Sequence, residues 1–171
     1  MTDNAIMTIT ELAKAIIKLA CEKNVMFVLA ESCTGGMIAA ALTDIAGSSA
    51  VLDRSLVTYS NQAKQDLLGV SNDVLANYGA VSAETAIAMT TGALLKTPAA
   101  RLAASVTGIA GPSGGSQDKP VGLVHFSLQW RGKPAVHDHQ TFDGNRDLVR
   151  KKSLHKSLTM IYDELTKCTT Y

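Results

Sequence analysis

The sequence has few aromatic residues and no excess of either charge. Aromatic residues make up 5% of the 171 positions, and 16 Lys and Arg residues stand against 15 Asp and Glu residues. Because nucleic-acid binding requires a basic surface that neutralises phosphates, this balance predicts no nucleic-acid partner. An anionic ligand therefore has to be held by a local group of side chains rather than by overall charge.

Cysteines and long apolar runs are also scarce. Cys21, Cys33 and Cys168 are odd in number and widely spaced, which suits neither a disulfide framework nor a structural zinc site. No signal-peptide pattern opens the sequence, and no apolar run reaches the roughly 20 residues that a spanning helix needs. We therefore expect a cytoplasmic protein without a membrane partner.

The patterns that are present predict a single α/β domain over residues 1–171. Hydrophobic residues make up 46% of the chain, and short β-rich runs alternate with runs of helical period. This order is typical of a three-layer-like fold with a mixed β-sheet flanked by helices. The expected strands are 25–30, 50–60, 101–111, 122–130 and 135–142, and the expected helices are 8–24, 36–47, 61–70, 71–79, 82–96 and a last helix from 145.

Several helix ends carry their own sequence signals. Thr8 with Glu11 is a capping box, in which each side chain binds the other residue's amide. Gly47 is expected to stop the second helix, while Asn61 and Ser82 are expected to cap the starts of later helices.

Three expected strands end in short polar segments: "ESCTGG" (31–36), "TYSNQAK" (58–64) and "TGIAGPSGG" (107–115). Ligands of α/β proteins gather outside the carboxyl ends of the strands. If the three strands are neighbours, these segments meet and form the candidate functional site.

The segment "ESCTGG" has two interpretations. Ser32 is a candidate nucleophile, with the free amides near Thr34, Gly35 and Gly36 binding substrate and stabilising an oxyanion. Alternatively, Ser32 or Thr34 simply caps the following helix. Cys33 is a rival nucleophile if the helix start lowers its pKa, or else a small buried packing residue.

None of the four histidines, His125, His137, His139 and His155, lies in these segments, so Cys33 lacks an obvious base. His137 and His139 share one face of the last strand. Two ligands without a third nearby are a weak metal signal, and we interpret them as solvated edge-strand residues. These histidines therefore predict no metal site.

Lysine can replace histidine as the base for a serine nucleophile when its pKa is depressed. Lys64 lies in the second segment, with Tyr59 and Asn61 beside it. The alternative is an ordinary surface lysine, since lysine is rarely buried.

The third segment is rich in glycine, with Gly108, Gly111, Gly114 and Gly115 free to turn their amides toward an anion. Lys119 could add charge. The segment matches neither the P-loop nor the dinucleotide-binding pattern, and a flexible connection is the alternative.

Arg146 and Arg150 lie one helical turn apart at the start of the last helix. They either clamp an anion or form a solvated face. The carboxylates Glu31, Asp66 and Asp118 are scattered, which argues against a metal-dependent pyrophosphatase.

Several motifs in order resemble the CinA C-terminal domain family: "LAESCTGGMIAAALTDIAGSS", "VTYSNQAKQDLLGV", "YGAVSAETA", "ASVTGIAGPSGG", "PVGLVHFSL" and "GNRDLVR". The resemblance spans about Leu12 to Leu165 and looks like the stand-alone form, without the additional N-terminal domain of larger CinA proteins. One departure is "AVLDRS", where many relatives carry an aromatic residue and a glycine.

The resemblance implies an amidase that hydrolyses nicotinamide mononucleotide (NMN) to nicotinic acid mononucleotide and ammonia in pyridine-nucleotide recycling. It implies a Ser–Lys mechanism with Ser32 and Lys64 and no cofactor, and it places Tyr59 and Thr107 at polar positions near the site. From these residues we expect Asn61, the glycine-rich loop and Arg146 to bind the substrate, and we expect a homo-oligomer. The alternatives are a nucleotide-binding or regulatory module without turnover, and a hydrolase of another amide.

Overall fold

The computed structural model describes residues 6–168 and contains one five-stranded sheet in the order β2-β1-β3-β4-β5. Strand β1 runs parallel to β2 and β3, whereas β4 is antiparallel to β3 and β5 is antiparallel to β4. The predicted mixed sheet is therefore confirmed. The strands are β1 (Phe27–Glu31), β2 (Leu52–Val57), β3 (Leu102–Gly108), β4 (Leu123–Trp130) and β5 (Val136–Thr141).

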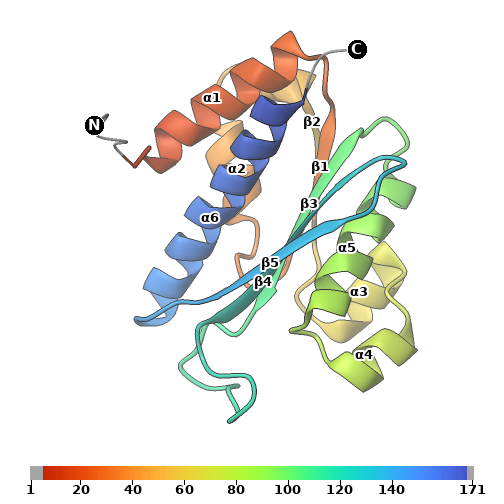
Figure 1. The fold of residues 1–171 in the computed structure, drawn as a ribbon, viewed down its shortest axis with the longest axis vertical. Helices are drawn as coiled ribbons and strands as arrows, with labels where there is room; N and C mark the ends of the chain where they lie inside the picture. The colour runs from red at the N-terminus through yellow and green to blue at the C-terminus, as the bar shows by residue number, and fades with distance from the viewer. Residues whose placement is uncertain (1–5, 169–171) are drawn as a thin grey trace.

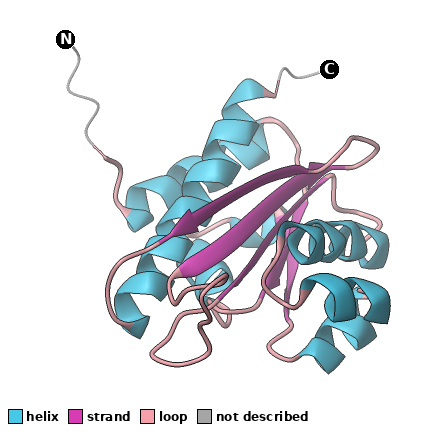
Figure 2. Ribbon diagram, turned by 60° about the horizontal axis from the view of Figure 1, so that its bottom comes forward, coloured by secondary structure: helices cyan, strands magenta, loops and turns pink. Residues whose placement is uncertain are grey.

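Helices cover both faces of the sheet and complete three layers (Figures 1 and 2). One face carries α1 (Ile9–Glu22), α2 (Met37–Thr43) and α6 (Arg146–Lys167). The other carries α3 (Asn61–Leu68), α4 (Asn72–Tyr78) and α5 (Ala83–Lys96). Within residues 6–168, no helix combines the length and apolar character needed to cross a membrane.

The sheet separates two hydrophobic clusters. Phe27 and Leu29 of β1 belong to the cluster under α1 and α6, and Val28 and Ala30 belong to the cluster under α5. All five residues of β1 are buried, which explains why this strand is a continuous apolar run rather than an alternating one. The edge strand β5 is largely exposed, as its alternating sequence predicted.

Two of the four predicted helix-end signals are observed. The Thr8–Glu11 capping box is present, and Ser82 caps α5 by accepting a hydrogen bond from the Thr85 amide. Two predictions are wrong. Helix α2 ends at Thr43, and Gly47, with a φ of 90°, instead opens a 3₁₀ turn. The cap of α3 is Ser60 rather than Asn61, because Ser60 has the extended backbone that a cap requires.

Helix α5 lies unusually close to α3 because residue 92 is glycine. A Cβ atom at Gly92 would be 1.9 Å from the carbonyl oxygen of Leu68, so no larger residue fits without moving α3. This contact fixes α3 against the sheet, and α3 carries Lys64.

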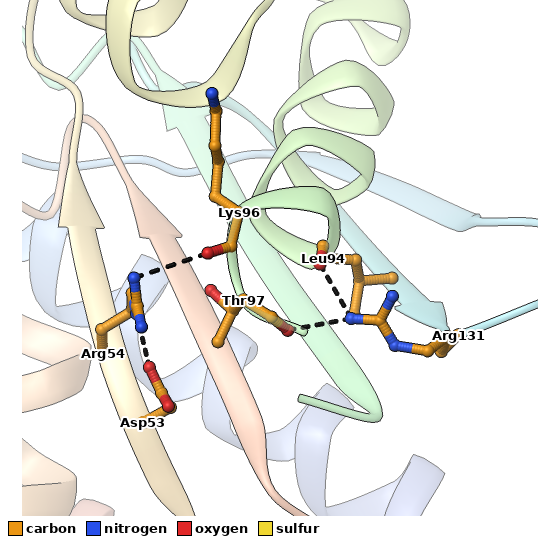
Figure 3. A network of polar contacts seen from close by, with 6 residues as sticks. All are labelled: Asp53, Arg54, Leu94, Lys96, Thr97 and Arg131. Carbon is orange, nitrogen blue, oxygen red and sulfur yellow. Dashed lines mark hydrogen bonds and ion pairs between the residues drawn. The ribbon is translucent and has the colours of Figure 1, made fainter. Parts of the chain in front are cut away.

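Two arginines bind the carbonyl groups at the C-terminal end of α5 (Figure 3). Arg131 donates hydrogen bonds to the carbonyls of Leu94 (2.8 Å) and Thr97 (2.9 Å), and Arg54 donates to the carbonyl of Lys96 (3.4 Å). The last carbonyls of a helix lack partners within the helix and carry partial negative charge, so these cations stabilise its end.

Candidate active site

The three polar segments meet at one edge of the sheet. Because β2, β1 and β3 are parallel neighbours, their carboxyl ends lie at that same edge. A cavity of about 260 Å³ opens there, slightly below the range of about 300 to 1,000 Å³ for small-molecule sites. It is lined by Ser32, Cys33, Tyr59, Lys64, Ala80, Val81, Thr107, Gly108, Ile109, Ala110, Gly111, Ser113, Gly114 and Arg146.

The side chains of Ser32 and Lys64 meet in this cavity. Lys64 Nζ lies 3.0 Å from Ser32 Oγ and donates a second hydrogen bond to the carbonyl of Thr58 at 2.8 Å. Lys64 is only 1% exposed, so it is not the ordinary surface lysine of the alternative interpretation. Burial lowers the pKa of Lys64 to about 8, because the charged form loses its hydration. A substantial share of this amine is therefore neutral near physiological pH.

The turn that presents Ser32 is organised by Glu31, which is fully buried. Its carboxylate accepts hydrogen bonds from the amides of Gly36 (2.9 Å), Ile38 (3.1 Å) and Ala39 (2.9 Å). It also accepts from the hydroxyls of Thr34 (2.7 Å) and Ser55 (3.1 Å). These donors compensate the burial of the charge, and they tie the strand end, the start of α2 and β2 together.

This arrangement corrects two expectations for "ESCTGG". Neither Ser32 nor Thr34 caps α2, since Glu31 fills that role from five residues upstream. The amides of Gly35 and Gly36 are also not free: they donate to the Ser32 carbonyl and to Glu31. In the part of the chain that the structure describes, the amides of Cys33 and Thr34 donate to no other residue, so they are the donors available beside Ser32.

Cys33 is a buried packing residue. It is 6% exposed and belongs to the hydrophobic cluster under α1 and α6. Desolvation raises the pKa of its thiol to about 12, so the thiolate needed for nucleophilic attack is absent at neutral pH. Histidines do not line the cavity, which leaves Ser32 as the nucleophile candidate.

The two arginines of α6 have different partners. Arg150 donates to the carbonyls of Cys33 (3.1 Å) and Thr34 (2.9 Å), so it holds the turn and is not part of an anion clamp. Arg146 lines the cavity and donates to the carbonyl of Gly111 (2.9 Å) and to the hydroxyl of Tyr59 (2.6 Å).

The glycine-rich loop contributes only in part. Gly108, Gly111 and Gly114 line the cavity, whereas Gly115 packs against Val121, whose backbone nitrogen would lie 2.8 Å from an added Cβ. Lys119 does not reach the cavity, since its ammonium group donates to the carbonyl of Tyr78.

The remaining predicted residues differ in position. Thr107 lines the cavity and donates to the carbonyl of Ala80 at 2.7 Å. Tyr59 also lines it but is 61% exposed. Asn61 is exposed and does not line the cavity.

The sequence interpretation missed several lining residues. Ala80 and Val81 precede α5 and reach the cavity through the packing of that helix on the sheet, which no local pattern signals. The role of Glu31 could have been inferred from the sequence, because an acidic residue at the buried end of a strand needs several hydrogen-bond donors.

A larger cavity of about 610 Å³ involves α1, α6 and β5, but no serine or cysteine is among its described lining residues.

Known proteins share both sequence and fold with this chain. The model of the CinA C-terminal domain matches residues 9–165. A nicotinamide-nucleotide amidohydrolase of Escherichia coli strain K12 is 40% identical over 99% of this chain and 100% of its own length. Another of that name from Enterobacter agglomerans is 50% identical over 81% of this chain and 84% of its own. The crystal structure of the competence/damage inducible protein CihA from Agrobacterium tumefaciens matches with a TM-score of 0.88 and 48% identity, covering 93% of this chain and 96% of that one.

Proposed function

Because this chain belongs to the CinA C-terminal domain family, we propose that it is an amidohydrolase that converts NMN to nicotinic acid mononucleotide and ammonia. The buried Ser32–Lys64 pair, with 3.0 Å between Oγ and Nζ at the wall of a small cavity, is the observation that carries the proposal. The near full-length likeness to nicotinamide-nucleotide amidohydrolases supports the choice of substrate.

In the first step, neutral Lys64 accepts the proton of the Ser32 hydroxyl while Oγ attacks the carboxamide carbon of the nicotinamide ring. The carbonyl oxygen gains the negative charge. The amides of Cys33 and Thr34, which donate to no other residue within 6–168, donate hydrogen bonds to this oxyanion. Arg150 holds the carbonyls of the same two residues and so keeps their peptide planes oriented.

In the second step, the protonated Lys64 returns its proton to the amide nitrogen, the C–N bond breaks, and ammonia leaves. An acyl ester on Ser32 remains. Water then attacks this ester with Lys64 again accepting a proton, and collapse of the second tetrahedral intermediate releases the carboxylic acid and restores the Ser32 hydroxyl. Thr58 supports both steps, because its carbonyl fixes the position of the Lys64 amine at 2.8 Å.

The phosphate of the substrate is assigned to the other wall of the cavity. Gly111 and Gly114 have φ values of 81° and 92° and allow the backbone to approach a ligand closely. Arg146 supplies positive charge on the same wall, and Tyr59 holds its guanidinium in place. Thr107, whose hydroxyl binds the carbonyl of Ala80, shapes the floor between the two ends.

Ammonia release from purified protein tests the proposal. We expect wild-type protein to produce ammonia from NMN, Ser32→Ala and Lys64→Met to lose that activity, and Cys33→Ala to retain it. Calorimetric titration with NMN is run beside each assay. Binding of NMN without ammonia from wild-type protein would favour the non-catalytic nucleotide-binding module, and full activity of Ser32→Ala would refute the serine assignment. A cytoplasmic location and a homo-oligomeric state stay predictions.

A further inference from the structure

A cluster of three histidines lies outside the candidate active site, on the two strands at the edge of the sheet. His125 of β4 is directly opposite His139 of β5, and His137 is two residues before His139 on the same strand. Successive side chains of a strand alternate between faces, so all three imidazoles lie on one face of the sheet. The sequence places two histidines on one face of β5, and the register adds the third from the neighbouring strand.

The separations between the centres of the three rings are close to those of a zinc site. Their centroids are 5.2, 5.5 and 5.9 Å apart. For tetrahedral zinc with Zn–N distances of about 2.0 to 2.1 Å, the centres of three coordinated imidazoles lie about 5.2 Å from one another. In the same geometry two ligand nitrogens lie about 3.3 Å apart. Nδ1 of His125 and Nε2 of His137 are 3.0 Å apart.

The charges around the cluster also suit a cation. Glu84 contributes a negative charge to both rings, whereas Lys119 opposes it at His125.

The cluster is open to solvent on one side. His139 is exposed, His137 is half-buried, and a cavity of about 350 Å³ is lined by His125 and His139 together with Glu84 and Asp118. An ion can therefore reach the rings, and a water molecule can complete its coordination.

We propose that His125, His137 and His139 form a binding site for a divalent transition-metal ion of the zinc type. Imidazole nitrogen is a preferred ligand of such ions, and three imidazoles with one water complete a tetrahedral set. This site is separate from the proposed amidase chemistry, although His125 pairs across the strands with Thr107, which lines the active-site cavity.

The site closes by rotation of the rings rather than being preformed. The ring planes are within 25° of parallel, and no three metal-ligating side chains in the described part of the chain already direct their donors at one position. The Cβ–Cγ torsion of histidine is broad, so turning the rings toward a shared ion costs little. At present the nearest two rings share a hydrogen bond, and an ion would replace that proton.

Titration of the metal-stripped, full-length protein with Zn²⁺ alone tests the proposal by calorimetry. We expect one equivalent to bind per chain. His137→Gln should raise the dissociation constant for Zn²⁺ by at least about 100-fold. Loss of even an outer-shell partner lowers metal affinity by about 10- to 100-fold. His155→Gln is the matched control, since this histidine contacts the carbonyl of Met7 and lies outside the cluster.

Two results would overturn the site: no saturable binding of Zn²⁺ by wild-type protein, or equal affinity of wild-type and His137→Gln protein. His139→Gln provides a second variant at an exposed position that folding does not depend on, and circular dichroism verifies the fold of each. Substitution of Co²⁺ gives an independent readout, because a tetrahedral site shows strong visible absorption that His139→Gln should lose.

Discussion

The pH dependence of ammonia release gives the sharpest test of Lys64 as the base. Burial lowers the pKa of this lysine to about 8, and the base must be neutral before it can accept the proton of Ser32. Raising the pH from 6 to 9 should therefore increase kcat/KM, because the neutral fraction of Lys64 in the free enzyme increases.

The size of the increase follows from the pKa. With a pKa of about 8, about 1% of Lys64 is neutral at pH 6, about 10% at pH 7 and about 90% at pH 9, which is an increase of about 90-fold. A lysine with the ordinary pKa of about 10.4 would be only about 0.04% neutral at pH 7. Between pH 6 and 7 the rate should thus rise about tenfold, and above pH 9 it should level off.

Initial rates of ammonia release at low NMN concentration give kcat/KM across this range. Lys64→Arg is the control variant, because its guanidinium stays protonated at every pH while keeping a positive charge in the cavity. It should lose at least about 100-fold in rate, within the range for general-base catalysis. A flat profile for the wild type from pH 6 to 9, or a midpoint near 10, would refute the reasoning.

Three further predictions concern stability. Lys64→Met should remove a rise in the free energy of unfolding between about pH 8 and pH 10.4, because the unfolded chain binds more protons than the folded chain in that window. Glu31→Gln should lower the free energy of unfolding by about 1 to 3 kcal/mol, because an amide nitrogen replaces an acceptor that faces buried donors. Gly92→Ala should lower it by about 1 to 3 kcal/mol through the clash with α3.

Urea unfolding measures all three effects, and each has its control. Parallel pH dependences of the wild type and Lys64→Met would contradict the first prediction. Glu11→Gln, in the exposed cap of α1, should cost less than Glu31→Gln, and an equal cost would show that burial does not matter. Leu95→Ala changes an exposed position of α5 and should be nearly neutral, so a loss as large as that of Gly92→Ala would contradict the packing argument.

The helix and sheet layers and the residues of the candidate site could be predicted where they depend on patterns within a short stretch of sequence. The continuous apolar run of β1 and the alternation in β5 reflect burial on two faces and on one, so both strands could be recognised. Ser32 and Lys64 were found because each follows a strand, and parallel neighbours bring such segments together.

Features that depend on long-range contacts could not be predicted. Arg150 reaches the turn at Cys33 across more than 100 residues of sequence, and its spacing from Arg146 only indicated a shared helix face. The strand register that sets His125 opposite His139 is likewise invisible in a single sequence, so the pair on β5 was interpreted without its third member. Glu31 was counted among scattered carboxylates although four of its five donors lie within eight residues of it; only Ser55 comes from another strand.

The burial of Cys33 has a practical consequence for chemical labelling. Alkylating reagents react with the thiolate, and a pKa of about 12 leaves almost none at neutral pH, while the exposed Cys21 stays accessible. A fluorophore or spin label can therefore be attached at Cys21 on α1, and at the partly exposed Cys168, without modifying the residue next to Ser32.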